Sequence, residues 1–240
     1  MPAPRFFVTG IGTEVGKTAV ASVLVEALRA DYWKPVQCGE LEASDTHTIQ
    51  GRVSFPVQCY PERYRLRALK SPHQAAAAEG VLIELSDFEL PKTDNALIVE
   101  GAGGVLVPLN DSNTMLDLMK QLQLPVIIVT RNYLGSLNHT FLTVEVLRQR
   151  GIPIAGLVFN GPFDAELEPF VSRKTELPIL FRMDTHAMLT LDIVKSYADS
   201  LRGTLFNDDN SIFAPSGQKP YLASVHPTSN CPGSSPHCAS

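Results

Sequence analysis

The chain has 240 residues, of which 44% are hydrophobic and 19% are charged, and its formal net charge is −5. This composition excludes a wholly disordered chain, a coiled coil and a fibrous protein. The slight acidic excess argues against a general nucleic-acid binder, which needs a basic surface. No apolar run reaches the length of a membrane span. We therefore expect a globular protein with neither a nucleic-acid nor a membrane partner.

The ends of the chain and its cysteines predict the compartment. The N-terminal segment has no basic stretch followed by an apolar one, so residues 6–8 are predicted to form a strand and not part of a signal peptide. The four cysteines, at positions 38, 59, 231 and 238, form neither a CxxC pair nor a dense framework. Their spacing predicts a reducing, cytoplasmic location.

Two kinds of segment alternate over the first two hundred residues. Short apolar, β-branched runs predict buried strands at 6–8, 96–99, 125–129 and 154–159. Apolar positions at helical spacing predict helices at 20–27, 115–122 and 191–201. This alternation predicts an α/β fold, a mostly parallel sheet with helices on both faces.

Two regions depart from that alternation. Residues 39–95 are predicted to be an insertion between core strands, with a strand over 53–60 and a helix over 71–79. The tail, 207–240, is rich in proline and serine and has no apolar period, which predicts disorder. Its two cysteines and two histidines lack the spacing of a zinc site, and incidental residues are the favoured interpretation. The predicted domains are therefore 1–206 and the tail 207–240.

The strongest motif is a glycine-rich turn that joins the first strand to the first helix. Residues 8–18 read Val-Thr-Gly-Ile-Gly-Thr-Glu-Val-Gly-Lys-Thr. Backbone N–H groups in such a turn, together with the helix dipole, attract phosphate. Lys17 is expected to reach the β- and γ-phosphates, and the Thr18 hydroxyl is expected to bind Mg²⁺. The motif is a variant, because Ile11 stands where the strict pattern has glycine. It predicts a P-loop NTPase-type fold.

Three further residues are candidates for the same site. Glu100 ends a predicted buried strand, where the carboxylate on the Mg²⁺ side of a nucleotide site usually lies. Asp45 is a second candidate carboxylate, although it or its neighbour Ser44 serves equally well as a helix N-cap. Lys34 ends the predicted second strand and points toward the carboxyl edge of the sheet, unless it is an ordinary surface lysine.

Taken together, these segments resemble dethiobiotin synthetases, the ATP-dependent ring-closing enzymes of biotin biosynthesis. The likeness covers roughly residues 5–203 and is carried by six segments: 8–18, 32–39 (Tyr-Trp-Lys-Pro-Val-Gln-Cys-Gly), 71–76 (Ser-Pro-His-Gln-Ala-Ala), 99–104 (Val-Glu-Gly-Ala-Gly-Gly), 134–140 (Leu-Gly-Ser-Leu-Asn-His-Thr) and, more weakly, 156–160 (Gly-Leu-Val-Phe-Asn).

The resemblance implies a ligase. In this family 7,8-diaminopelargonate captures CO₂ as a carbamate, ATP phosphorylates the carbamate, and the second amine closes a cyclic urea with release of ADP and phosphate. Lys17, Lys34 and Thr13 are the implied catalytic residues, which neutralise and align the reacting oxygens. Mg²⁺ is the implied cofactor and ATP the co-substrate. The implied metal ligands are Thr18, Asp45 and Glu100.

The resemblance also implies binding residues and an assembly. The implied nucleotide set is Gly12, Thr13, Glu14, Val15, Gly16, Lys17, Thr18 and Asn160, with Asn160 at the adenine edge unless it only supports a turn. The implied substrate set is Lys34, Cys38, Gly101, Gly103, Leu134, Gly135, Ser136 and Asn138. Members are homodimers, in which the segment 134–139 contacts the substrate carboxylate across the two-fold axis.

Three departures from the family pattern stand out. Ile11 and Gly12 replace a threonine and an acidic residue or glycine, so we expect a polar contact to be lost. Cys38 replaces serine or threonine and is a weaker donor. The stretch 181–184, which contains Arg182, replaces a Gly-Glu-Ile-Pro-like stretch near the base, and this predicts a looser or altered nucleotide preference.

Other interpretations stay open at this point. One is a nucleotide-switched ATPase of the partition or maturation type, although the loop lacks that group's early lysine. Another is a degenerate family member that binds nucleotide without turnover, which Ile11, Cys38 and Arg182 motivate. A related amide-forming synthase would need a glutaminase domain, for which the chain has no room. The fold alone does not separate these functions.

Overall fold

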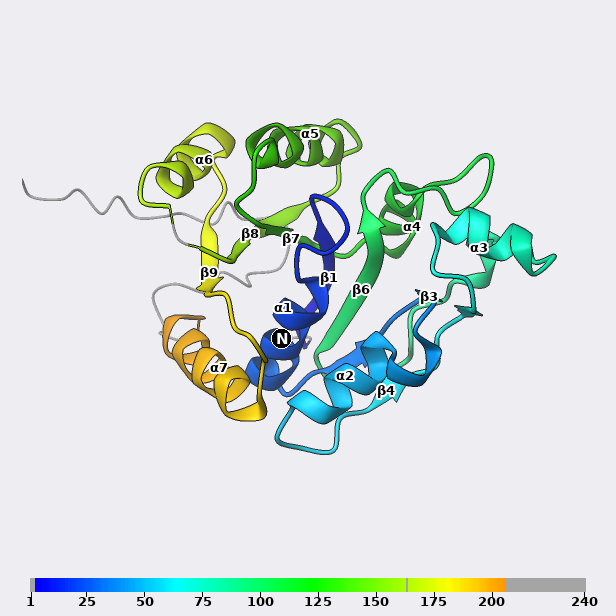
Figure 1. Cartoon of the computed structure of the whole chain (residues 1–240), viewed down its shortest axis with the longest axis horizontal. Coiled ribbons are helices and arrows are strands. Elements are labelled where there is room, and N and C mark those ends of the chain that lie inside the picture. Colours follow the sequence, from blue (N-terminus) through cyan, green and yellow to red (C-terminus); the bar gives the residue numbers. More distant parts are fainter. Residues whose placement is uncertain (1–2, 163, 206–240) are drawn as a thin grey trace, which may run out of the picture.

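A computed structural model describes residues 3–162 and 164–205 of the chain, and Figure 1 shows its element order. The sequence-predicted tail, 207–240, lies outside the described residues. Within the described part of the chain, no helix is both long and apolar enough to cross a membrane.

A seven-stranded sheet forms the centre of the protein, and all of its strand pairings are parallel. The order across the sheet is β4 (Cys59–Tyr60), β2 (Asp31–Trp33), β6 (Leu97–Gly104), β1 (Arg5–Gly10), β7 (Val126–Thr130), β8 (Ile154–Asn160) and β9 (Ile179–Met183). A smaller parallel pair joins β3 (Val36–Cys38) to β5 (Tyr64–Leu66). The prediction of a mostly parallel sheet is confirmed.

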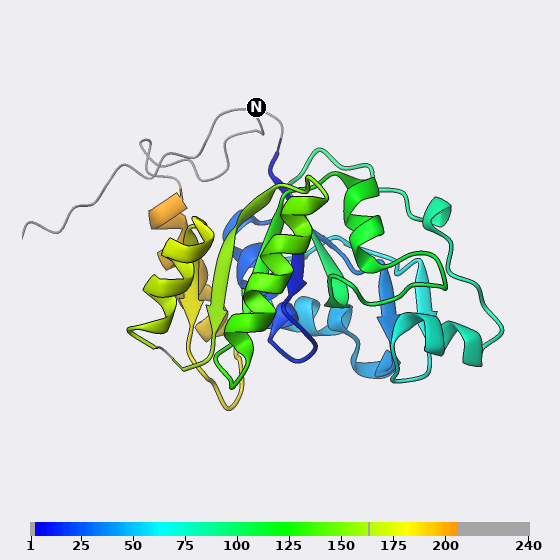
Figure 2. The ribbon, with the colours of Figure 1, turned by 90° about the horizontal axis from the view of Figure 1, so that it is seen from above.

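Helices cover both faces of the sheet (Figures 1 and 2). On one face α1 (Lys17–Leu28) packs between α2 (Asp45–Arg52) and α7 (Leu191–Leu205). On the other lie α4 (Met115–Leu122), α5 (Ser136–Gln149) and α6 (Leu167–Thr175). The short α3 (Pro72–Ala78) packs against the small sheet, and single 3₁₀ turns occupy Leu41–Ala43 and Leu85–Asp87.

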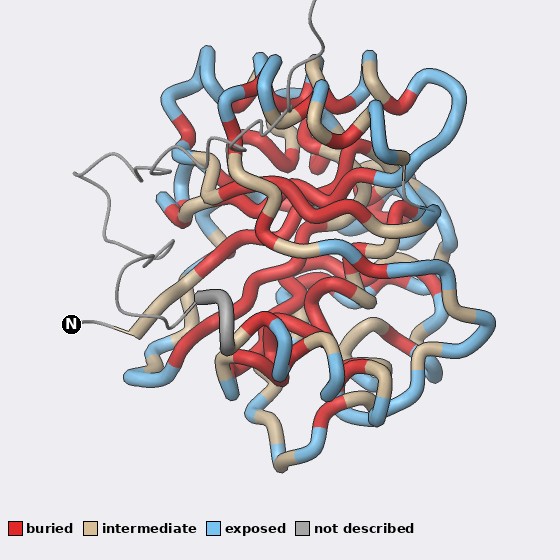
Figure 3. Tube along the Cα trace, turned by 90° about the vertical axis from the view of Figure 1, so that its left-hand side faces the viewer, coloured by how far each residue is buried: buried red, intermediate tan, exposed pale blue. Residues whose placement is uncertain are grey.

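The core follows from the continuous apolar runs in the central strands. Every residue of β7 is buried. In β1 every residue after the first is buried, and in β6 the first five residues are buried. The sheet is therefore the continuous buried layer in Figure 3. Strands buried on both faces are expected where helices cover both sides of a parallel sheet. The carboxyl ends of β1, β2 and β6 therefore meet at one rigid edge.

Two sequence predictions need correction. Only residues 59 and 60 of the predicted strand 53–60 form a strand, β4. Pro56 interrupts the run, and the Ser54 amide and hydroxyl donate to the buried Glu26 instead of to a neighbouring strand, both at 2.7 Å. The predicted apolar face of α7 also begins one turn late, because Leu191 is 36% exposed while Val194 is fully buried.

Candidate active site

The phosphate loop runs from the end of β1 to the start of α1, as its motif predicts. Gly16 has φ +93°, and a Cβ there would lie 1.9 Å from Asn160 Nδ2. Only glycine meets both demands, a left-handed backbone and a close neighbour. Asn160, at the end of β8, donates its side-chain amide to the Val15 carbonyl at 2.8 Å. The nucleotide candidates in the loop and on β8 are thus brought together.

Four of the predicted catalytic and metal-binding residues form one cluster beside this loop. Lys34 Nζ lies 2.6 Å from Asp45 Oδ2 and 3.0 Å from Glu100 Oε1. The Thr18 hydroxyl lies 2.8 Å from Asp45 Oδ1 and 2.9 Å from Glu100 Oε1. Lys34 and Glu100 are almost wholly buried, whereas the Asp45 side chain keeps 30% exposure. The cluster therefore opens to solvent on the Asp45 side.

The pairing of β2 with β6 explains how Lys34 and Glu100 meet. Tyr32 on β2 stands opposite Ile98 on β6. Side chains two residues apart on a strand share a face. Glu100 follows Ile98 by two residues and Lys34 follows Tyr32 by two, so Lys34 and Glu100 come to the same face at the carboxyl edge of the sheet. The predicted orientation of Lys34 toward this edge is confirmed.

Asp45 reaches the cluster from the first turn of α2. Ser44, and not Asp45, is the N-cap of this helix, with its hydroxyl accepting from the His47 N–H at 3.4 Å. The Asp45 side chain is thereby left free of the capping role. Its backbone N–H donates to the Gln37 side chain at 3.4 Å.

The position of Lys17 in the phosphate loop disfavours the charged form of its side chain. Lys17 is 7% exposed, and its ammonium donates to the Gly12 carbonyl at 3.2 Å. Burial and the nearby Lys34 ammonium lower the pKa of Lys17 from 10.5 to about 8, although Glu100 and Asp45 act in the opposite direction. A bound phosphate would add negative charge beside the ammonium and raise this pKa.

The second lysine is stabilised by its neighbours. Burial alone would lower the pKa of Lys34, but the attraction of Glu100 and Asp45 outweighs it and raises that pKa above its ordinary value. Likewise, burial disfavours the charged form of Asp45, yet Lys34 and the Thr18 hydroxyl hold its pKa below the usual range. Lys34 thus stays an ammonium ion against a buried acidic partner.

The oxygen atoms of this cluster suit a magnesium ion. Thr18 supplies a hydroxyl, and Asp45 and Glu100 supply carboxylate oxygens within 2.9 Å of it. Mg²⁺ prefers such hard oxygen donors and usually takes one or two carboxylates together with substrate phosphates. In the described residues there is no group of three or more His, Cys, Asp or Glu side chains that could hold a metal ion.

The glycine-rich end of β6 lies against the same cluster and the loop. The Gly101 carbonyl accepts from Lys34 Nζ at 3.2 Å. Gly103 has φ +65°, and a Cβ there would lie 3.7 Å from the Thr13 hydroxyl. Thr13 itself is exposed. Cys38, at the end of β3, is half-buried, and burial raises the pKa of its thiol to about 11.

The remaining substrate candidates lie at the start of α5. Leu134, Gly135 and Asn138 are exposed there. Ser136 is buried, and its hydroxyl accepts from the Tyr133 N–H at 3.4 Å. Tyr133 also shares a 2.7 Å hydrogen bond with His139 Nδ1. None of the contacts described within the chain joins this segment to the Lys34 cluster.

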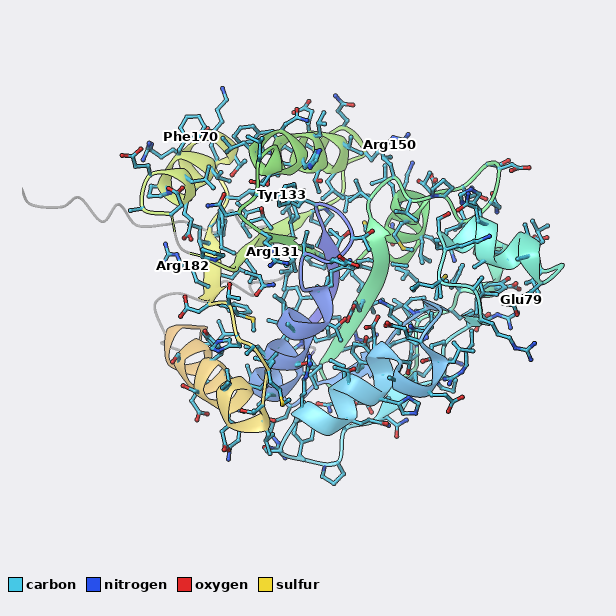
Figure 4. All side chains as sticks on the ribbon, in the orientation of Figure 1. Glu79, Arg131, Tyr133, Arg150, Phe170 and Arg182 are labelled. Carbon is cyan, nitrogen blue, oxygen red and sulfur yellow. The ribbon has the colours of Figure 1, made fainter. Side chains whose placement is uncertain are left out.

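Two residues near the site were absent from the sequence prediction. The Tyr32 hydroxyl donates to Glu100 Oε2 at 2.9 Å, and the two-residue spacing from Lys34 is a signal that points to it. Arg131 follows β7 and donates to the Glu14 carbonyl at 3.3 Å. Figure 4 labels Arg131 near the phosphate loop. No motif marks Arg131, because an exposed arginine after a strand is common.

Two of the sequence departures have structural partners. Ile11 is buried in the core, with its N–H donating to the Val129 carbonyl at 3.1 Å, so it packs instead of offering a polar contact. Arg182 on β9 pairs with the buried carboxylate of Glu168 on α6. These two positions therefore serve packing and charge pairing within this chain.

Comparison with known proteins agrees with this geometry. A family model described as an AAA domain matches residues 4–190. A solved structure named for plasmid partition, from Borrelia burgdorferi B31 and bound to AMPPNP, superposes with a TM-score of 0.53 at 13% identity, over 84% of this chain and 98% of that one. At that identity the likeness concerns the fold alone.

The curated relatives are more specific. The ATP-dependent dethiobiotin synthetase of Cytophaga hutchinsonii is 46% identical over 199 residues, which cover 82% of this chain and 96% of the relative. That of Christiangramia forsetii is 40% identical over 201 residues, or 83% and 97% of the two chains. With this similarity over nearly the whole length of the relatives, the chain belongs to the ATP-dependent dethiobiotin synthetase family.

Proposed function

We propose that this chain closes the ureido ring of dethiobiotin from 7,8-diaminopelargonate and CO₂, with ATP converted to ADP and phosphate. The observation that carries the proposal is the cluster of Lys34, Asp45, Glu100 and Thr18 beside the phosphate loop. A switch ATPase needs a phosphate loop and a metal site, but it does not need a second buried lysine at the substrate edge. Lys34 therefore favours the ligase over the partition-type alternative.

The reaction has three steps, in which the chain supplies positioning and charge. One amine of the substrate adds to CO₂ and loses a proton, which gives a carbamate. A carbamate oxygen attacks the γ-phosphorus and ADP leaves. The second amine attacks the carbamate carbon, loses a proton and displaces phosphate. Negative charge gathers around the γ-phosphoryl group, and Lys17 and Lys34 supply two fixed positive charges there.

The roles of the other residues follow from their places around the cluster. Thr18, Asp45 and Glu100 would hold Mg²⁺, which when bound neutralises phosphate charge. Thr13 and the backbone of Gly101 and Gly103 would line the path between carbamate and phosphate. Asn160, already bonded to the loop, would meet the adenine edge. Cys38, half-buried and weakly polar, would contact substrate less firmly than a hydroxyl does.

The proposed assembly is a homodimer formed through the start of α5. Leu134 is fully exposed, Leu142 is 54% exposed and Tyr133 is 39% exposed, an apolar group that a second copy would cover. In such a dimer the segment of Leu134, Gly135, Ser136 and Asn138 would meet the substrate carboxylate of the opposite copy. Sedimentation at micromolar concentration tests this: Leu134→Arg should shift the protein toward monomer, and a wild-type monomer would contradict the assembly.

The test of the function measures phosphate release from Mg-ATP with and without diaminopelargonate and bicarbonate, with mass detection of dethiobiotin in the same samples. Release that requires both co-substrates and yields product is expected. ATP hydrolysis indifferent to the diamine would refute the substrate. Nucleotide binding without turnover would support the degenerate-member alternative, and Cys38→Thr would be the first change to try.

A further inference from the structure

Tyr32 lies beneath the charge cluster and is fully buried. Its hydroxyl donates to Glu100 Oε2 at 2.9 Å. The other oxygen of the same carboxylate, Oε1, accepts from Thr18 at 2.9 Å and from Lys34 at 3.0 Å. The two oxygens of Glu100 thus have separate partners, one beneath the cluster and one toward the phosphate loop.

We propose that Tyr32 is a positioning residue that holds the Glu100 carboxylate in the orientation a magnesium-bound nucleotide requires. The inference rests on the proposed function in one respect, that Glu100 lies on the metal side of the nucleotide. The geometry of Tyr32 suits this role, because the hydroxyl, the only polar atom of its side chain, donates to Glu100 and the side chain is buried from solvent.

Glu100 needs such a positioning residue because the last torsion of a glutamate side chain rotates easily. Rotation about the last side-chain bond of glutamate has broad wells, so the chain alone does not fix where each oxygen points. With Oε2 bonded to Tyr32, Oε1 faces Thr18. Without that hydroxyl, Glu100 is free to turn both oxygens toward the Lys34 ammonium, and the oxygen that Thr18 and a metal would share moves away.

Tyr32 is suited to this duty by its position. Its phenol O–H donates to Glu100 Oε2 at 2.9 Å from a fully buried side chain. A hydrogen bond to a charged group is stronger than a neutral one, which makes this contact a firm anchor.

The fold offers a matched control. Tyr60, on the neighbouring strand β4, donates its hydroxyl to Asp31 Oδ2 at 3.1 Å. Tyr60→Phe therefore removes the same kind of tyrosine–carboxylate bond from a neighbouring strand, at Asp31 and not at Glu100. A purely structural contribution of a tyrosine hydroxyl would be lost in both variants.

The experiment measures the affinity of the non-hydrolysable analogue AMPPNP by calorimetry, once with excess Mg²⁺ and once with EDTA. The quantity compared is the factor by which Mg²⁺ strengthens binding. Tyr32→Phe should reduce this factor by about tenfold, as expected for loss of one charge-assisted contact, while affinity in EDTA changes by less than about twofold. Tyr60→Phe should leave both values unchanged.

Glu100→Gln separates the failure of this inference from that of the proposed metal site. If Glu100→Gln abolishes the Mg²⁺ factor and Tyr32→Phe leaves it intact, the positioning role is overturned. If Glu100→Gln leaves the factor intact, the metal-side assignment of Glu100 fails, and the role of Tyr32 fails with it. In the double variant the loss of the hydroxyl should have no further effect, because the two changes share one pathway.

A measurement on the wild-type sequence covers the case in which Tyr32→Phe does not fold. The chain has six tyrosines, and 3-fluorotyrosine labels them all. Single Tyr→Phe changes at the other five assign their ¹⁹F signals and leave that of Tyr32 by elimination. Adding Mg²⁺ to the AMPPNP complex should shift the Tyr32 signal and not the Tyr60 signal. An unmoved Tyr32 signal would overturn the inference.

Discussion

Replacing Lys17 by methionine should make the nucleotide-free protein more stable while destroying its activity. Lys17 is almost wholly buried in the phosphate loop, where burial and Lys34 lower its pKa from 10.5 to about 8. A difference of that size corresponds to roughly 3 kcal/mol of unfavourable charge in the folded state at pH 7, at about 1.4 kcal/mol for each pH unit. Methionine keeps the length of the side chain and removes the charge.

One contact is lost in exchange. Lys17 Nζ donates to the Gly12 carbonyl at 3.2 Å, but Gly12 is only partly buried, so water replaces much of this hydrogen bond. A typical hydrogen bond contributes about 1 kcal/mol. The expected net gain for Lys17→Met is therefore about 2 kcal/mol in the free energy of unfolding at pH 7, measured by urea denaturation in EDTA without nucleotide.

The pH dependence distinguishes this cause from a general packing effect. Between pH 8 and 10.5 the unfolded wild type binds more protons at Lys17 than the folded protein does, so wild-type stability rises with pH in that window. The advantage of Lys17→Met should be full below pH 8 and shrink as the pH rises toward 10.5. Lys195→Met, at an exposed lysine of α7, is the control and should show no such trend. A variant no more stable than wild type at pH 7, or an advantage independent of pH, would refute the reasoning.

Two substitutions and one reactivity measurement also test the site. Gly16→Ala should lower the free energy of unfolding by about 1–2 kcal/mol through backbone strain alone, because φ is +93°. It should also weaken AMPPNP binding more than about tenfold, because the new Cβ would overlap the Asn160 amide. An unchanged AMPPNP affinity in calorimetry would contradict this. Lys34→Met should lower the free energy of unfolding by about 3 kcal/mol and abolish dethiobiotin formation, since it leaves a buried carboxylate without its cation; a stable, active variant would exclude the role. Burial raises the pKa of the Cys38 thiol to about 11, so its alkylation by iodoacetamide should stay slow up to pH 9. Peptide mass spectrometry follows the rate. A rate-against-pH curve with its midpoint near pH 8.5 would show an ordinary, accessible thiol and contradict this.

The parts of this protein that are readable from the sequence are those in which a short motif fixes both the fold and the chemistry. The phosphate loop is such a case, because its glycines, Lys17 and Thr18 act within one turn. The positions of Glu100 and Lys34 are also predictable from the sequence, since a polar residue that ends a buried strand lies at the carboxyl edge of a parallel sheet. The structure brings all of these together.

The parts that escaped prediction depend on contacts between segments far apart in sequence. The two-residue spacing of Tyr32 from Lys34 puts both on one face, but the register of β2 and β6, which brings the Tyr32 hydroxyl to Glu100, is not set by any local pattern. The run 53–60 has strand-forming residues, but the backbone N–H and the hydroxyl of Ser54 both donate to Glu26 of α1 and not to a neighbouring strand. Arg182 finds a buried partner in Glu168 on a different element. Pairings of this kind are set by tertiary packing, which overrides local preference.

The two side chains that bond to carbonyls of the phosphate loop have a consequence for ligand capture. Arg131 holds the Glu14 carbonyl and Asn160 holds the Val15 carbonyl, and every described peptide bond is trans. In a trans peptide the C=O and the next N–H point in opposite directions. Tethering each oxygen therefore aims the next N–H, that of Val15 or Gly16, away from the side chain that holds the carbonyl. The loop is preorganised before any nucleotide arrives, so binding loses less conformational entropy than the closure of a floppy loop would, and more of the contact energy appears as affinity.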